Sequence, residues 1–139
     1  MKWISAIALF TIATLTAATE LFAQEPVLKA NIPFNFTVGE RSMPAGEYTI
    51  CSPGRQIVMV QSADRRHVEL VIASQNHRDP ATANKLVFDK YGEFYFLHRV
   101  LSTANSSLNL NIPSSKVEKR IRNLEAMLQT EEQTVVAAR

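Results

Sequence analysis

The chain has 139 residues, and its 15 basic and 13 acidic side chains leave a net charge of +2 at pH 7. Because the basic residues are interspersed with acidic ones, the charge pattern argues against nucleic-acid binding. The only cysteine, Cys51, cannot close an intramolecular disulfide, and we expect it to behave as a small apolar residue in a strand.

Residues 1–23 have the composition of an export signal. Lys2 precedes an apolar run from Trp3 to Ala18, and Ala23 offers the small side chain that signal peptidase requires. The run is shorter than the roughly 20 residues that a membrane-spanning helix needs. We expect cleavage after Ala23, with cleavage after Ala18 or a retained anchor as alternatives. The mature protein is then periplasmic or extracellular and has no membrane span.

The first half of the mature chain reads as a series of β-strands. Residues 30–38 alternate between apolar and polar side chains, which predicts a half-buried strand, and Pro33 places it at a sheet edge. A turn over 43–46 leads into a second strand over 47–51. Consecutive apolar residues over 56–61 predict a central strand covered on both faces, which forms a hairpin with 67–73.

The polar segment 74–84 is the longest interruption, and we interpret it as an exposed loop of the kind that often carries function. After it, residues 85–91 and 93–101 flank Gly92 and form the strongest hairpin signal in the chain. Strict alternation points Phe94 and Phe96 inward. It places Tyr91, Tyr95 and Leu97 on the other face, where a second sheet, the helix or a partner must cover them.

The chain ends in a short strand over 108–112 followed by a helix. Ser115 and Glu118 form a capping box, and the apolar positions of the helix recur at helical spacing, which predicts a stripe that docks on the sheet. The positions of that stripe are Val117, Ile121, Leu124 and Leu128. Beyond residue 128 the polar composition predicts a mobile tail over 129–139. The fold expected is one all-β domain over 24–128, a small antiparallel sandwich or partly open barrel of six to seven strands with one C-terminal amphipathic helix.

The sequence holds no recognisable catalytic, cofactor or metal motif. None of His67, His77 and His98 has a second ligand at the spacing of a zinc or iron site, so His98 is expected to be a partly buried, hydrogen-bonded histidine. The chain lacks a Gly-x-Ser-x-Gly elbow, and its four glycines stand singly at turns rather than in a phosphate-binding loop. We therefore expect no enzyme activity, no cofactor and no metal.

The segment 30–39, continued by 43–50, resembles the opening of an uncharacterised family of short exported β-proteins common in Acidobacteria. A weaker similarity extends through 85–97 and 112–118. The matching residues are turn glycines, prolines and core aromatics, so the resemblance implies a shared β-fold and no particular activity.

Together these patterns predict an exported, non-enzymatic protein that acts as a binding or structural component of the cell envelope. Its partner is an unidentified protein or envelope component, contacted through a sheet face, a sheet edge or the 74–84 loop. The alternative is a small-ligand or carbohydrate-binding module, with Tyr91, Tyr95 and Leu97 as the contact residues.

Overall fold

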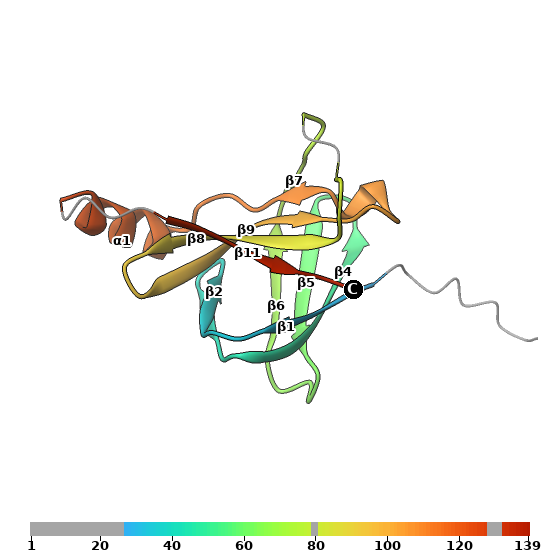
Figure 1. Ribbon diagram of the computed structural model, residues 1–139, viewed down its shortest axis with the longest axis horizontal. Coiled ribbons are helices and arrows are strands. Elements are labelled where there is room, and N and C mark those ends of the chain that lie inside the picture. The colour runs from blue at the N-terminus through green and yellow to red at the C-terminus, as the bar shows by residue number, and fades with distance from the viewer. Residues whose placement is uncertain (1–26, 79–80, 128–131) are drawn as a thin grey trace, which may run out of the picture.

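The computed structural model describes residues 27–78, 81–127 and 132–139, which form two packed β-sheets and one α-helix (Figure 1). The predicted all-β sandwich with a C-terminal helix is confirmed, although the described residues form eleven strands rather than six or seven. The signal segment and its cleavage site lie outside the described residues.

The first sheet has four antiparallel strands in the order β1 (Leu28–Ile32), β4 (Gly46–Gly54), β5 (Ile57–Ser62) and β6 (Val68–Ile72). The second has the order β11 (Glu132–Ala137), β8 (Lys85–Tyr91), β9 (Phe94–Leu101), β10 (Leu110–Asn111) and β7 (Ser74–Gln75). Two short strands, β2 (Phe36–Val38) and β3 (Arg41–Met43), pair with each other, and β2 also pairs with β9 in parallel. A 3-10 turn, η1 (Ser106–Leu108), precedes β10, and the helix α1 covers Lys116–Ala126.

The strand expected over 30–38 is divided in two. β1 ends at Ile32, directly before Pro33, which has no backbone N–H to donate to a ladder. The side chain of Asn35 then accepts a hydrogen bond from the backbone of Ala45 at 2.9 Å, which ties the connection to the next turn. The chain therefore crosses from the first sheet to the second between β1 and β2.

Aromatic rings fill the centre of the sandwich. Phe36 of β2 makes edge contacts with Tyr48 and Phe88, with ring centroids 5.0 and 5.5 Å apart. The hydroxyl of Tyr48 donates a 2.6 Å hydrogen bond to the carbonyl of Pro44, so its buried polar end is satisfied. Burying each side chain of this size stabilises the fold by about 1.5–3 kcal/mol.

The hairpin of β5 and β6 is confirmed, and β5 is an inner strand as expected. The expectation that β5 is covered on both faces is wrong. Its burial alternates, and Ile57 is exposed together with Leu70 and Ile72 of β6. No element within the described residues covers this outer face, so the apolar run over 57–60 indicates strand propensity rather than burial on both sides.

The faces of the aromatic hairpin differ from those predicted, and the hairpin also contains a β-bulge. Phe88 pairs with Leu97 and Val87 pairs with Arg99, so His98 is an extra residue in β9. Across the turn Tyr91 pairs with Phe94, and paired residues share a face. Tyr91 and Phe96 therefore lie on one face, while Tyr95 and Leu97 contribute to the core between the sheets. Phe94, predicted to point inward, is 51% exposed at the tip of the hairpin.

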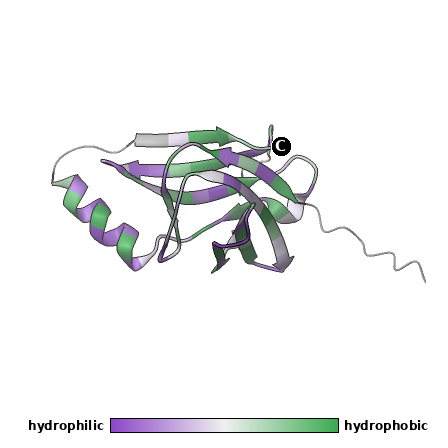
Figure 2. Cartoon of the chain, turned by 90° about the horizontal axis from the view of Figure 1, so that it is seen from below, coloured by the Kyte–Doolittle hydropathy of each residue, from purple (hydrophilic) through white to green (hydrophobic). Residues whose placement is uncertain are grey.

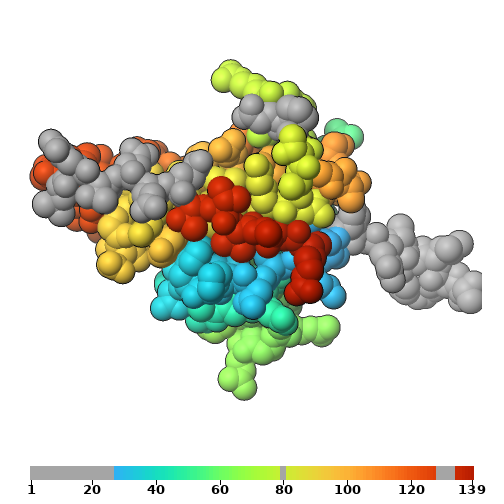
Figure 3. Space-filling view, in the orientation of Figure 1, coloured from blue at the N-terminus to red at the C-terminus, as the bar shows by residue number. Residues whose placement is uncertain are grey.

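The predicted mobile tail is wrong for residues 132–139. Here β11 pairs with β8 over six residues, from Glu132 opposite Lys90 to Ala137 opposite Lys85. The backbones of Arg139 and Lys29 then exchange two hydrogen bonds of 2.8 and 2.9 Å, joining this end of the second sheet to β1. Figure 3 shows the C-terminal segment lying along the N-terminal strand on the surface of the molecule. Residues 129–131 lie outside the described part of the chain.

The helix begins as predicted, but its apolar stripe is only partly buried: Val117 and Ile121 are half-buried and Leu124 is exposed. Ser115 is the N-cap, and its Oγ accepts a 3.0 Å hydrogen bond from the backbone N–H of Glu118. The helix extends away from the sandwich (Figures 1 and 2), which leaves Leu124 and Met127 exposed. Glu118 is its buried residue. Leu128 lies outside the described residues, and no helix among those described is long and apolar enough to cross a bilayer.

Candidate functional site

The three residues predicted as contacts do not form an exposed surface. Tyr91 and Leu97 are each only 2% exposed, and Tyr95 is half-buried. The ring of Tyr95 stacks on Phe34 with centroids 3.9 Å apart, on the face of the hairpin opposite to Tyr91. A coplanar pair of exposed tyrosines, which would favour stacking on a sugar, is therefore not formed.

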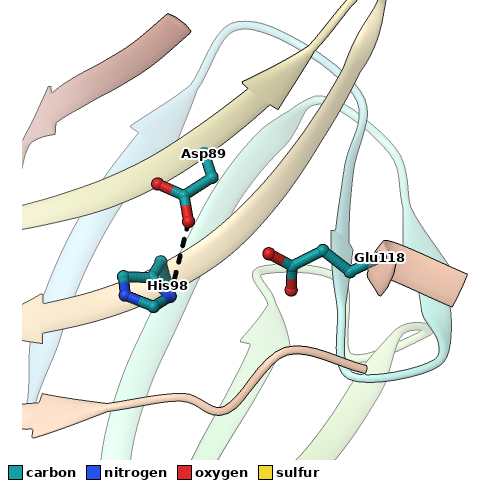
Figure 4. A group of neighbouring side chains, drawn as sticks. All are labelled: Asp89, His98 and Glu118. Carbon is teal, nitrogen blue, oxygen red and sulfur yellow. Dashed lines mark ion pairs between the residues drawn. The ribbon is translucent and has the colours of Figure 1, made fainter. Parts of the chain in front are cut away.

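A cluster of ionisable side chains lies on the face of the β8–β9 hairpin that carries Tyr91. Asp89 of β8, His98 of β9 and Glu118 of α1 each direct one potential ligand atom to a common point, and these three atoms lie within 4.8 Å of one another (Figure 4). Asp89 Oδ2 lies 3.5 Å from His98 Nδ1. The Nδ1 atom is buried and makes no hydrogen bond.

Regular alternation along β9 places His98 on the face of Asp89, because Asp89 pairs with Phe96 and His98 lies two residues further along the strand. The bulge acts after this point. His98 is the extra residue, so Arg99 pairs with Val87, and Val100 as well as Leu97 points into the core. The carbonyl of His98 accepts a 2.7 Å hydrogen bond from Ile112, which holds the bulge against the segment leading to the helix.

Glu118 is the most buried member of the cluster, with 4% of its surface exposed. Its carboxylate points toward Asp89 and His98 (Figure 4) and accepts a hydrogen bond from the Tyr91 hydroxyl at 3.4 Å. Burial, followed by the neighbouring charge of Asp89, raises the pKa of Glu118, and the charge of His98 opposes this rise. The cluster therefore favours a positive charge or a proton beside the two carboxylates.

A pocket of about 570 Å³ also borders His98 and is lined by residues of β7, β9 and the ends of β6 and β10. Its volume falls in the range of about 300–1,000 Å³ that is typical of small-molecule sites. The polar side chains around it are Gln56, Ser74, Asn76, Arg78, His98, Arg99 and Asn111, and its apolar surface comes from Ile72, Ala73, Ile112 and Pro113. No carboxylate is found among these lining residues.

Several of the groups on the pocket are shielded from solvent. Asn76 is a buried residue, and the Oδ1 atom of Asn111 is buried with no hydrogen-bond partner in the described chain. A buried amide oxygen is normally paired, so an unpaired one next to open space indicates hydrogen-bonding capacity that a ligand or water can meet. Another pocket, of about 690 Å³ beside β1 and β4, mixes Glu47 with Arg65 and has no single sign of charge.

Sequence reasoning found part of this region. The 74–84 loop, expected to carry function, contributes Ser74, Asn76 and Arg78 to the pocket, and its first two residues form β7. The Asp89–His98–Glu118 cluster was missed because its members come from three elements and show no ligand spacing along the chain. The one signal in the sequence is the position of His98, two residues after Phe96 on the same strand face.

Comparison with known proteins gives no relative: no family model, no curated protein and no solved structure matches this chain. The resemblance to a family of exported proteins therefore stays a prediction.

Proposed function

We propose that this protein is an exported, non-enzymatic binding protein that holds a small organic anion in the pocket at the ends of β6, β7, β9 and β10. The observation that carries the proposal is the charge of the lining. Arg78 and Arg99 line the pocket, and its described lining includes no acidic residue. A cavity lined by one sign of charge concentrates ligands of the opposite sign.

The remaining lining defines the class of ligand further. A guanidinium binds a carboxylate with two parallel hydrogen bonds, and the amides of Asn76 and Asn111 can orient further polar groups of the same ligand. The apolar surface of Ile72, Ile112 and Pro113 suits a hydrocarbon body. A carboxylate with a short apolar chain satisfies both parts of the site.

A binding role is favoured over catalysis by the surroundings of His98. Nucleophilic catalysis requires a hydroxyl or thiol hydrogen-bonded to its base. Within the described residues, His98 contacts the carboxylate of Asp89 and makes no hydrogen bond to a hydroxyl. Cys51, the only thiol, is buried in β4 as expected and does not line the pocket.

Binding is tested by NMR titration of residues 24–139 with hexanoate, and with hexan-1-ol as the neutral probe of the same chain length. We expect hexanoate to shift the side-chain amide signals of Asn76 and Asn111, and hexan-1-ol to shift them far less. Arg99→Gln should weaken binding of hexanoate, whereas Arg120→Gln on the exposed surface of α1 should not. Equal shifts with both probes, or none, would contradict the proposal.

Export is tested separately, by expressing the full chain in a bacterial host and determining the N-terminus of the product in each fraction. The proposal expects a product beginning at Gln24 in the periplasm or medium. A full-length product confined to the cytoplasm would contradict export without affecting the binding result.

A further inference from the structure

We propose that Asp89, His98 and Glu118 bind one Zn²⁺ ion, which links the first turn of α1 to the β8–β9 hairpin. This site is distinct from the anion pocket, although His98 borders both.

The geometry requires little rearrangement. The three ligand atoms lie within 4.8 Å of one another, whereas atoms bound to one zinc ion at about 2.0–2.1 Å in a tetrahedron are about 3.3 Å apart. Rotations of the three side chains can close this difference. His98 already presents Nδ1 to the cluster, and Figure 4 shows its other nitrogen pointing away from both carboxylates.

The burial of Glu118 beside Asp89 suits a bound cation. Glu118 is 4% exposed and is the buried residue of α1, although Leu124 on the same helix is left in solvent. Burying a carboxylate beside another carboxylate costs free energy unless a positive charge or a proton compensates. A hydrogen bond with the Ser114 side chain and the charges of His98 and Arg122 compensate part of this cost for Glu118, and a divalent cation held between the ligands would balance both carboxylates.

Two further features of the site point to a ligand. The Nδ1 atom of His98 is buried, faces both carboxylates and makes no hydrogen bond, and it lies 3.5 Å from Asp89 Oδ2, so in the neutral imidazole it can serve as a ligand atom beside them. The hydroxyl of Tyr91 reaches Glu118 Oε1 at 3.4 Å, the position of an outer partner that orients a ligating carboxylate.

The donor set favours zinc over the hard cations. One imidazole and two carboxylates suit Zn²⁺, whereas Mg²⁺ and Ca²⁺ prefer oxygen ligands alone. Three protein ligands leave one tetrahedral position for water.

The test is a calorimetric titration of EDTA-treated residues 24–139 with ZnCl₂, repeated with MgCl₂. We expect one Zn²⁺ per chain and no comparable binding of Mg²⁺. His98→Gln and Glu118→Gln should each weaken zinc binding by at least about 100-fold, since loss of an outer-shell partner alone costs about 10–100-fold. His77→Gln and Glu93→Gln, at exposed positions away from the cluster, are the matched controls and should bind as the wild type does.

Thermal unfolding separates loss of the site from loss of the fold. Without metal, Glu118→Gln should melt no lower than the wild type, because it removes one of two neighbouring carboxylates. Added Zn²⁺ should raise the melting temperature of the wild type and not that of Glu118→Gln. Equal zinc binding by the wild type, His98→Gln and Glu118→Gln would overturn the proposal, as would no binding at all or equal binding of Mg²⁺. The Arg99 variant should keep the zinc site, so this test and the anion test fail independently.

Discussion

Two neighbouring valines of β11 should respond oppositely to the same substitution. Val136 packs against the core opposite Leu86, whereas Val135 is 54% exposed opposite Val87. Threonine has nearly the shape and the strand propensity of valine, so Val→Thr changes little except polarity. Val136→Thr should destabilise the protein, and Val135→Thr should have almost no effect.

The size of the effect follows from burial. A hydroxyl buried without a hydrogen-bond partner costs about 1–3 kcal/mol in mutational data, and Val136 is only half-buried, so we expect about 1 kcal/mol. For a domain of this size that corresponds to a fall in melting temperature of about 4 °C. Val136→Asp should cost more, because a carboxylate loses more hydration than a hydroxyl does.

Urea unfolding of both variants, monitored by far-UV circular dichroism, measures the difference in their free energies of unfolding. The strand assignment is refuted if Val135→Thr and Val136→Thr are equally neutral, which is the behaviour of a segment that does not pack. It is also refuted if Val135→Thr is the more harmful of the two.

Two other predictions concern turns. Gly39 has φ +58°, and a Cβ there would lie 2.8 Å from Val71 Cγ1. Gly39→Ala should therefore lower the free energy of unfolding, measured in urea, by at least the roughly 1–2 kcal/mol that a left-handed residue costs. Gly54→Ala, where the added Cβ would meet only a 3.7 Å contact, is the control. A hydrogen bond from the Ser62 hydroxyl, and after it one from the Arg66 N–H, lowers the pKa of Asp64. The stabilisation that these two hydrogen bonds give the folded state is therefore present at neutral pH and is lost as pH falls below about 4. Asp64→Asn should flatten that part of the acid dependence, and an unchanged pH profile would contradict the assignment.

Much of the fold could be predicted because alternation and turn chemistry are local. The hairpin around Gly92 and the helix start at Ser115 follow from residues adjacent in sequence. The C-terminal strand was missed because its β-branched run, Thr134 to Val136, is short and follows a polar stretch. This run forms a strand because it pairs with the edge of β8, and no local sequence pattern reveals that edge.

The candidate site was harder to predict because its three members come from different elements. Regular alternation places His98 on the face of Phe96, but nothing in the sequence of β9 identifies Asp89 and Glu118 as its neighbours on that face. Two positions of the apolar stripe predicted for α1, Val117 and Ile121, are half-buried, but the buried residue of the helix is Glu118, which contacts Tyr91 of the hairpin. A buried acid on an amphipathic helix cannot be recognised until its partners on other elements are known.

The most direct test of the proposed function is a crystal structure of residues 24–139 grown with hexanoate. The account predicts a carboxylate bound by Arg99 in the pocket, with its hydrocarbon chain against Ile112 and Pro113. A pocket that holds only water, with hexanoate absent or bound elsewhere, would contradict it.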